Sequence, residues 1–276
     1  MIAILSDLHL GLAAAPDARA ILPAIEGASE LILNGDAAET ASPTLRTAAE
    51  AALAELIDRS TRSGIACMRI EGNHDPGTGE LMALRAGGAV LVTHGHAFHP
   101  SIAPWSPAAD AVSARFAAAH AEGAALDEPL RTLHAARAAA FAEREHEHAR
   151  SPAAVLAGML RRPWAFPLVV GYWRIFPELS ARFAELASTT GAPVRAIVSG
   201  HSHRAGAWFV RGTLVLNTGS FTFPGQPHAV LVDEAEVAIV PLVRRGGEWR
   251  QEAAVRRAWR IDAIAAATAA RSTPVS

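Results

Sequence analysis

Residues 4–11 read ILSDLHLG, and the rest of the chain is organised around this stretch. The short apolar run at residues 1–5 is typical of a buried strand. Asp7 and His9 follow that run two residues apart, and side chains at i and i+2 of an extended chain point to the same side. An acid and an imidazole at this spacing predict half of a metal site, just beyond the end of a strand.

The composition is that of a globular protein. The chain has 276 residues, of which 50% are hydrophobic and 19% charged, and this length suits one large α/β domain or two small ones. The formal net charge of −2 provides no overall attraction to nucleic acid, so a nucleic-acid partner is not expected unless a local basic patch forms.

The basic residues and the single cysteine exclude several kinds of chemistry. All 25 basic residues are arginine, so no lysine is present to form a Schiff base or a P-loop, and a basic side chain that holds phosphate must be arginine. Cys67 has no cysteine partner within the chain, which indicates a reducing compartment. We expect a cytoplasmic protein without a signal peptide, because the N-terminal apolar run is too short for one and has no basic residues before it. No apolar run approaches the roughly 20 residues that span a bilayer.

Strands and helices are predicted to alternate through the first hundred residues. Strands are expected at residues 1–5, 31–33, 66–70 and 89–92, and helices at 17–25, at 43–62 and in a short stretch after residue 76. This alternation predicts a mainly parallel sheet with helical crossovers. Ligands of such sheets bind outside the carboxyl ends of the strands, and each polar motif of this chain falls at one of those ends.

The remainder of the chain divides into three parts. Residues 100–191 have helical spacing and are interpreted as an inserted cap of about four helices, while 1–99 and 192–276 form the core. A strand at 196–198 is followed by short strands at 207–210, 213–216, 228–232 and 237–243, which are expected to be antiparallel and to form a second sheet or the far half of a sandwich. Residues 252–271 are predicted to form an amphipathic helix.

Five strand-end motifs occur in a fixed order. They are Asp7-x-His9, Gly35-Asp36-x-x-Glu39, Gly72-Asn73-His74-Asp75, His94-Gly95-His96 and Gly200-His201-x-His203. This set resembles the calcineurin-like metallophosphoesterase superfamily over residues 1–99 and 195–243. The resemblance implies an α/β fold, namely a four-layer αββα sandwich, here with a helical cap insertion.

The resemblance also implies a dinuclear metal centre. Asp36 would bridge two divalent ions about 4 Å apart, which can clamp a phosphate and generate hydroxide near neutral pH. Two groups of ligands would complete the site: Asp7, His9 and His203 for one ion, and Asn73, His94 and His201 for the other. The mixture of imidazole and carboxylate suits Mn, the expected metal, with Fe and Zn as alternatives.

The catalytic roles are likewise implied by the resemblance. A metal-bound hydroxide would attack phosphorus in line, while His74 assists the leaving oxygen and Asp75 orients the His74 imidazole. Glu39 is expected to support the ligands or a turn rather than to bind an ion. His96 is left open between a wall of the site and a substrate contact. Residues 143–148 are expected to form a solvated helix face rather than an extra metal site.

Within the superfamily, the motifs look most like the branch of UDP-2,3-diacylglucosamine hydrolases. This resemblance implies a small phosphorylated or lipid-linked substrate, such as a nucleotide-sugar pyrophosphate or another small phosphodiester. The cap would then hold acyl chains and contact the inner face of a membrane peripherally, or it would simply pack on the core. His96 stands where that branch usually has Asp. Two alternatives remain: a nuclease of the same superfamily, and a metal-free scaffold protein with this fold.

Overall fold

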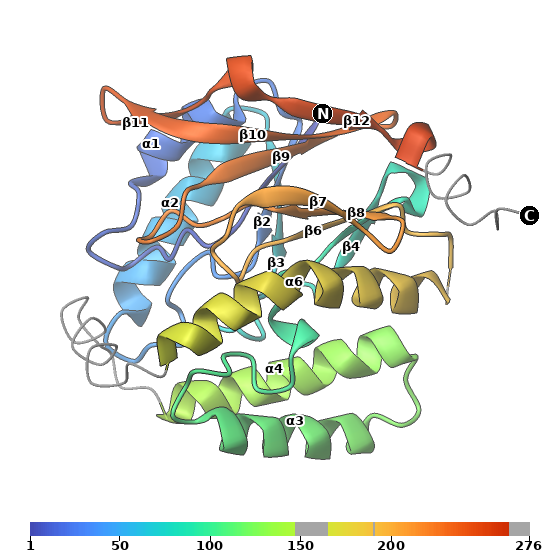
Figure 1. Ribbon diagram of the computed structural model, residues 1–276. Coiled ribbons are helices and arrows are strands. Elements are labelled where there is room, and N and C mark those ends of the chain that lie inside the picture. The colour runs from blue at the N-terminus through green and yellow to red at the C-terminus, as the bar shows by residue number, and fades with distance from the viewer. Residues whose placement is uncertain (147–164, 190, 265–276) are drawn as a thin grey trace, which may run out of the picture.

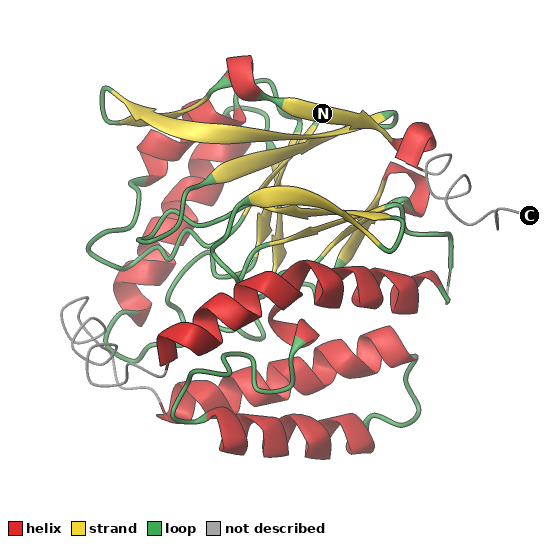
Figure 2. Cartoon of the chain, in the orientation of Figure 1, coloured by secondary structure: helices red, strands yellow, loops and turns green. Residues whose placement is uncertain are grey.

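The computed structural model describes residues 1–146, 165–189 and 191–264. Two β-sheets lie face to face, and helices cover their outer faces (Figures 1 and 2). This arrangement confirms the predicted α/β sandwich. Within the described residues, no helix combines the length and the apolar character that crossing a membrane requires.

The first sheet contains three parallel strands from the N-terminal region, joined by antiparallel strands from the C-terminal region. Its order is β11-β10-β9-β1-β2-β3, and β12 also pairs with β10. The strands are β1 (Ile2–Leu5), β2 (Glu30–Asn34), β3 (Ala66–Ile70), β9 (His228–Val232), β10 (Glu236–Arg245), β11 (Glu248–Gln251) and β12 (Arg257–Arg260).

The second sheet has a parallel centre and antiparallel edges. Its order is β4-β5-β6-β8-β7, in which β5, β6 and β8 run parallel. The strands are β4 (Ala83–Arg85), β5 (Val90–Val92), β6 (Ala196–Ser199), β7 (Gly206–Val210) and β8 (Thr213–Asn217).

Alternating side chains of the strands separate the layers. Ile4 and Ile32 face the second sheet, whereas their neighbours Leu5 and Leu33 face helices on the outer side. Those helices are α1 (Ala18–Ile21), the 3₁₀ helix η1 (Leu22–Ile25) and α2 (Arg46–Arg62). Gly64, in the left-handed region at φ 77°, follows the end of α2.

Three longer elements lie on the other side of the sandwich (Figure 1). Helix α6 (Ala165–Ser188) packs on β6, β7 and β8 and shares an apolar cluster with them, and α3 (Ala109–Glu122) packs along α4 (Glu128–His146). Helix α4 also contacts α6 and the 3₁₀ helix η3 (His96–Phe98), which follows β5. The boundaries of the cap remain a prediction. Helix α6 lies within the predicted cap and forms the outer layer on the second sheet. Any further helix expected in the cap falls outside the described residues.

Three predictions of secondary structure are wrong. The amphipathic helix predicted for residues 252–271 is not formed over residues 252–264, which contain the 3₁₀ helix η4 (Ala253–Val255) and β12 before a final helical turn. Strand β12 pairs with the edge of the long strand β10 instead. Residues 265–271 lie outside the described part. The expected helix after residue 76 is replaced by β4 and the 3₁₀ helix η2 (Ala86–Gly88). The late strands do not form a sheet of their own, since they divide between the two sheets.

Candidate metal centre

The five polar motifs meet at the carboxyl ends of parallel strands from both sheets. They follow β1, β2 and β3 of the first sheet, and β5 and β6 of the second. Buried Asn34, at the end of β2, joins the sheets here, because its Nδ2 donates to the carbonyl of Thr93 at 3.2 Å. The sandwich therefore places residues distant in sequence at one edge.

Five of the seven predicted ligands adopt a left-handed backbone conformation. The φ angles lie between 48° and 61° for Asp7, His9, Asp36, His201 and His203, among eight such non-glycine residues in the described part of the chain. This conformation costs roughly 1–2 kcal/mol for an L-residue, and such residues concentrate at functional sites. Hydrogen bonds between loops hold it: the amides of Asp7 and His9 donate to the carbonyls of Gly35 and Asp36 at 3.1 and 3.0 Å.

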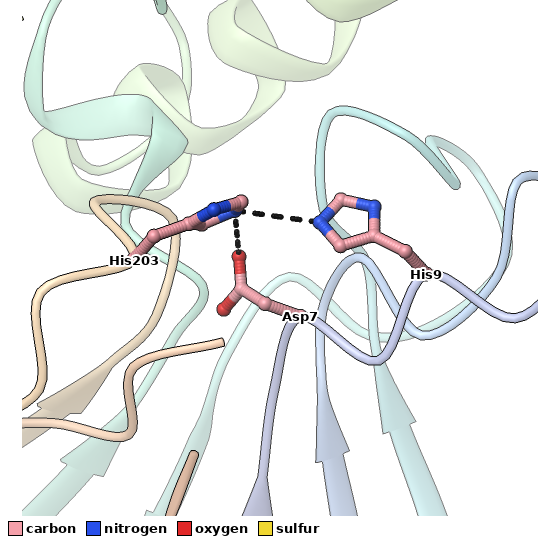
Figure 3. A group of neighbouring side chains, drawn as sticks. All are labelled: Asp7, His9 and His203. Atoms are coloured by element: carbon pink, nitrogen blue, oxygen red, sulfur yellow. Dashed lines mark hydrogen bonds and ion pairs between the residues drawn. The ribbon is translucent and has the colours of Figure 1, made fainter. Parts of the chain in front are cut away.

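The first group of potential ligands is formed by Asp7, His9 and His203 (Figure 3). His203 Nε2 lies 3.1 Å from Asp7 Oδ1 and 3.4 Å from His9 Nε2. Asp7 and His9 are buried. Burial opposes ionisation of Asp7, yet His94 and His203 hold the pKa of its carboxyl below the usual value. Two imidazole nitrogens and one carboxylate oxygen thus converge on a single point, which suits a cation.

The second group consists of Asp36, His94 and His201. His94 Nδ1 lies 2.9 Å from the carbonyl of Asn34, and His201 Nε2 lies 3.1 Å from that of Ile102. Each of these nitrogens must therefore carry the proton and donate, which leaves the other nitrogen of each ring as the one that can bind a metal.

Two buried atoms near the second group have no hydrogen-bond partner and could bind a metal ion. His94 Nε2 is buried and lies 3.2 Å from Asp36 Oδ2, but it has no hydrogen-bond partner. Asn73 Oδ1 is buried and without a partner too, while its Nδ2 donates to Glu143 Oε2 at 3.0 Å. An unsatisfied buried acceptor costs about 1–3 kcal/mol, and coordination by a cation would remove that cost. Asn73 Oδ1 therefore has the chemistry of the additional ligand that the motif predicts.

Two glycines allow the acids to approach the backbone. A Cβ atom on Gly72 would collide with the Asp36 carboxylate, and a Cβ on Gly200 would collide with that of Asp7. Each carboxylate therefore packs directly against a bare Cα, and the glycines in the two motifs are a steric requirement of the site.

Glu39 joins a predicted ligand to the predicted catalytic histidine. Its Oε1 lies 2.7 Å from His9 Nδ1, and its Oε2 lies 2.9 Å from His74 Nδ1. Burial alone would lower the pKa of His74, but the Glu39 carboxylate and Asp36 raise it to about 10 in the absence of metals. The expected supporting role of Glu39 is therefore to hold both histidine rings by hydrogen bonds and to keep His74 protonated. The side chain of His74 remains partly exposed.

Asp75 does not orient His74, in contrast to the expectation from the motif. Its Oδ1 accepts hydrogen bonds from the amides of Asp36 and Gly72 at 3.0 and 2.7 Å, and its Oδ2 accepts one from Ala37 at 2.9 Å. The side chain is directed into the turn after β2, where burial and the nearby Asp36 raise its pKa to about 6. Asp75 therefore stabilises the loop that carries Asp36.

His96 and the region around Asn217 belong to the wall of the site. His96 is buried, has no hydrogen-bond partner, and its ring centre lies 5.5 Å from that of His94. Burial and His94 hold its pKa well below the usual value, so this imidazole is neutral. Asn217 Nδ2 donates to the carbonyl of Gly200 at 2.6 Å, which identifies residues 217–220 as a structural turn supporting the β6 loop.

Two charged residues of the site were missed in the sequence. Glu143 is buried and the side chain of Arg144 is 11% exposed, so the solvated face predicted for residues 143–148 is wrong at these positions. Residues 147 and 148 lie outside the described part. The local sequence does not indicate that Glu143 and Arg144 are buried, because alternating acids and bases on a helix are typical of a solvated face. Only the packing of α4 on α6 and η3 brings these two side chains to the site.

Together, the stacked sheets and the two groups of imidazole and carboxylate ligands define a sandwich protein with a candidate metal centre at its strand ends. The family model of the calcineurin-like phosphoesterase superfamily domain matches residues 1–236, so the chain belongs to this superfamily. No curated protein matches the chain.

Several solved structures are similar to this chain at low sequence identity. A protein of Streptococcus pneumoniae TIGR4, described as a predicted phosphoesterase, is 15% identical, with 94% of this chain and 96% of that chain covered and a TM-score of 0.41. Vps29 from Entamoeba histolytica, complexed with Zn, is 11% identical, with 94% and 98% covered and a TM-score of 0.39. A cold-active protein-tyrosine phosphatase of a psychrophilic Shewanella species is 13% identical, with 91% and 79% covered and a TM-score of 0.42.

Proposed function

We propose that this protein is a metal-dependent phosphoester hydrolase with a dinuclear centre. Asp36 would bridge the ions; Asp7, His9 and His203 would complete one site, and Asn73, His94 and His201 the other. The observation that carries the proposal is the pair of separate ligand groups, one around Asp7 and one around Asp36, both held at strand ends by strained backbone.

The chemistry follows from the donors present. When bound, divalent ions would polarise the phosphoryl oxygens and activate a water molecule for in-line attack on phosphorus, and the mixed donors suit Mn, with Fe or Zn as alternatives. His74 would donate its proton to the leaving oxygen. Glu39 fixes the ring, because its carboxylate accepts the Nδ1–H of His74 and leaves the Nε2 proton to be donated to the leaving oxygen.

The substrate class that we propose is a small phosphodiester or a nucleotide-sugar pyrophosphate, including lipid-linked forms as in the UDP-2,3-diacylglucosamine hydrolase branch. Exposed apolar side chains on α6, among them Phe166, Leu168 and Ile175, support this choice, because the helix also packs above the second sheet beside the site. A cytoplasmic location and peripheral membrane contact through the predicted cap belong to the same proposal, and cell fractionation would test them.

The decisive experiment is an activity panel on metal-stripped protein with Mn, Fe or Zn restored. The substrates would be p-nitrophenyl phosphate, its bis ester, cyclic nucleotides and UDP-sugars with and without acyl chains. Metal-dependent turnover of the acylated UDP-sugar alone would support the lipid-linked substrate, and turnover of the simple esters would support only the general activity. A protein that binds no metal would be a scaffold. One that binds metal but cleaves none of these substrates would next be tested on DNA and RNA, and cleavage of those alone would identify a nuclease.

A further inference from the structure

Two charged side chains of helix α4 contact residues of the predicted metal centre. Glu143 is 1% exposed, and its Oε2 accepts a hydrogen bond from Asn73 Nδ2 at 3.0 Å. Arg144, the next residue, has its Nη2 3.1 Å from the same Glu143 oxygen and its Nη1 3.3 Å from His74 Nδ1. A cap helix thus touches both a predicted ligand and the predicted proton donor.

Glu143 determines which way the amide of Asn73 faces. A carboxylate can only accept hydrogen bonds, so the Asn73 nitrogen must face Glu143 and the oxygen must face the opposite side. That oxygen is buried without a hydrogen-bond partner, as an atom that waits for a cation would be. A reversed amide would present N–H groups to a cation and could not bind it. The contact from α4 therefore keeps Asn73 competent as a ligand.

Arg144 lies beside the predicted proton donor. His74 Nδ1 donates its hydrogen bond to Glu39, so this nitrogen cannot also accept one from the Arg144 Nη1 that lies 3.3 Å away. Glu143 holds the guanidinium in this place, because its Oε2 lies 3.1 Å from Arg144 Nη2. The planar guanidinium is well suited to bind the oxygens of a phosphoryl group beside His74.

Other arginines close to the site have different partners. Arg204 Nη1 donates to the carbonyl of Trp173 at 2.9 Å, and Arg137 Nε donates to Glu71 at 2.8 Å. Arg144 instead contacts the predicted proton donor itself. Since the chain contains no lysine, the basic side chain that binds a phosphate here must be an arginine.

We propose that the Glu143–Arg144 pair makes helix α4 part of the reaction site: Glu143 is a positioning residue that orients Asn73 toward the second metal, and Arg144 binds a non-bridging oxygen of the phosphoryl group. This inference rests on the proposed function, because it assigns the phosphate contact of that same centre.

The test for Glu143 compares its Ala and Gln variants by calorimetric titration of the metal-stripped protein with Mn. Glu143→Ala is expected to weaken Mn binding at one of two sites about tenfold or more, whereas Glu143→Gln keeps an acceptor oxygen and restores most of that affinity. Glu145→Ala, an exposed position on the same helix, is the matched control. Undiminished Mn binding by Glu143→Ala would overturn the positioning role.

The test for Arg144 measures binding of inorganic phosphate, as an inhibitor and by titration of the Mn-loaded protein. Arg144→Gln is expected to keep both Mn ions, to weaken phosphate binding about tenfold or more and to raise KM for the ester. Arg115→Gln is the control, because the Arg115 side chain on α3 is 46% exposed. Glu143→Gln should weaken phosphate binding too, because it removes the charge that holds the guanidinium.

The outcomes separate this inference from the proposed function. If the wild-type protein binds neither Mn nor phosphate, the proposed function fails. If it binds both and Arg144→Gln binds phosphate as tightly as the wild type does, the phosphate role of Arg144 is overturned while the hydrolase stands.

Discussion

Glu39 Oε2 lies 2.9 Å from His74 Nδ1, and the other oxygen of the same carboxylate lies 2.7 Å from His9 Nδ1. Because His9 Nε2 faces Asp7 and His203, its Nδ1 must carry the proton and needs an acceptor. The same holds for His74 when its Nε2 faces the substrate. A carboxylate offers both acceptor oxygens, so Glu39 couples the geometry of a metal ligand to that of the proton donor.

Replacing His74 by Asn should reduce turnover without removing the metals. Proton transfer from a positioned side chain contributes typically 10²–10⁴-fold, so we expect kcat to fall by about that factor. Metal analysis of the purified variant should match the wild type, because the ring lies outside the two ligand groups built on Asp7 and Asp36. Loss of a metal instead would show that His74 is itself a ligand, as its proximity to His9 and Glu39 permits.

Replacing Glu39 by Gln should shift the pH profile of kcat. Glu39 raises the pKa of His74, and His74 must be protonated to donate, so activity is lost as pH rises through that pKa. Without the carboxylate the pKa falls, and the alkaline limb should move to lower pH by about 1–2 units. Gln also supplies one acceptor where two imidazoles need one each, so kcat should fall at every pH. An unshifted alkaline limb would mean that another group controls it.

The sequence was sufficient to predict the ligands that follow the strands, but not the residues of other elements that surround them. Asp7 and His9 could be placed because the apolar run before them and their spacing are local properties of the chain. Glu143 could not, since a buried and a solvated acid on a helix look alike until tertiary packing decides which face is covered. Asp75 was misassigned for a related reason: adjacency to His74 in sequence says little about direction, and its carboxylate turns toward backbone amides of a different loop.

Substituting Gly72 by Ala should disrupt the metal centre by steric collision. The added Cβ would meet the Asp36 carboxylate and the Asp36 amide, which are held by Asp75 and His74 and cannot move freely. We expect loss of Mn binding and a lower melting temperature. Gly171→Ala is the matched control, because its Cβ would meet nothing within 4 Å on helix α6, and alanine there should stabilise the helix by roughly 0.5–1 kcal/mol. Equal behaviour of the two variants would contradict the close packing at Gly72.

Metal binding should release a proton and strengthen as pH rises. Burial opposes a charge on His94, but Asp36 and Asp7 raise its pKa to about 9 in the metal-free protein, so the ring is protonated near neutral pH. A metal needs the lone pair of Nε2 and must displace that proton. Mn affinity should therefore rise by up to about tenfold per pH unit from about pH 7 and level off above the pKa of His94. Calorimetry in buffers of different ionisation enthalpy would count the protons. If no proton is released near neutral pH, His94 is already neutral there, and the electrostatic balance between its ring and the two aspartates differs from the one described.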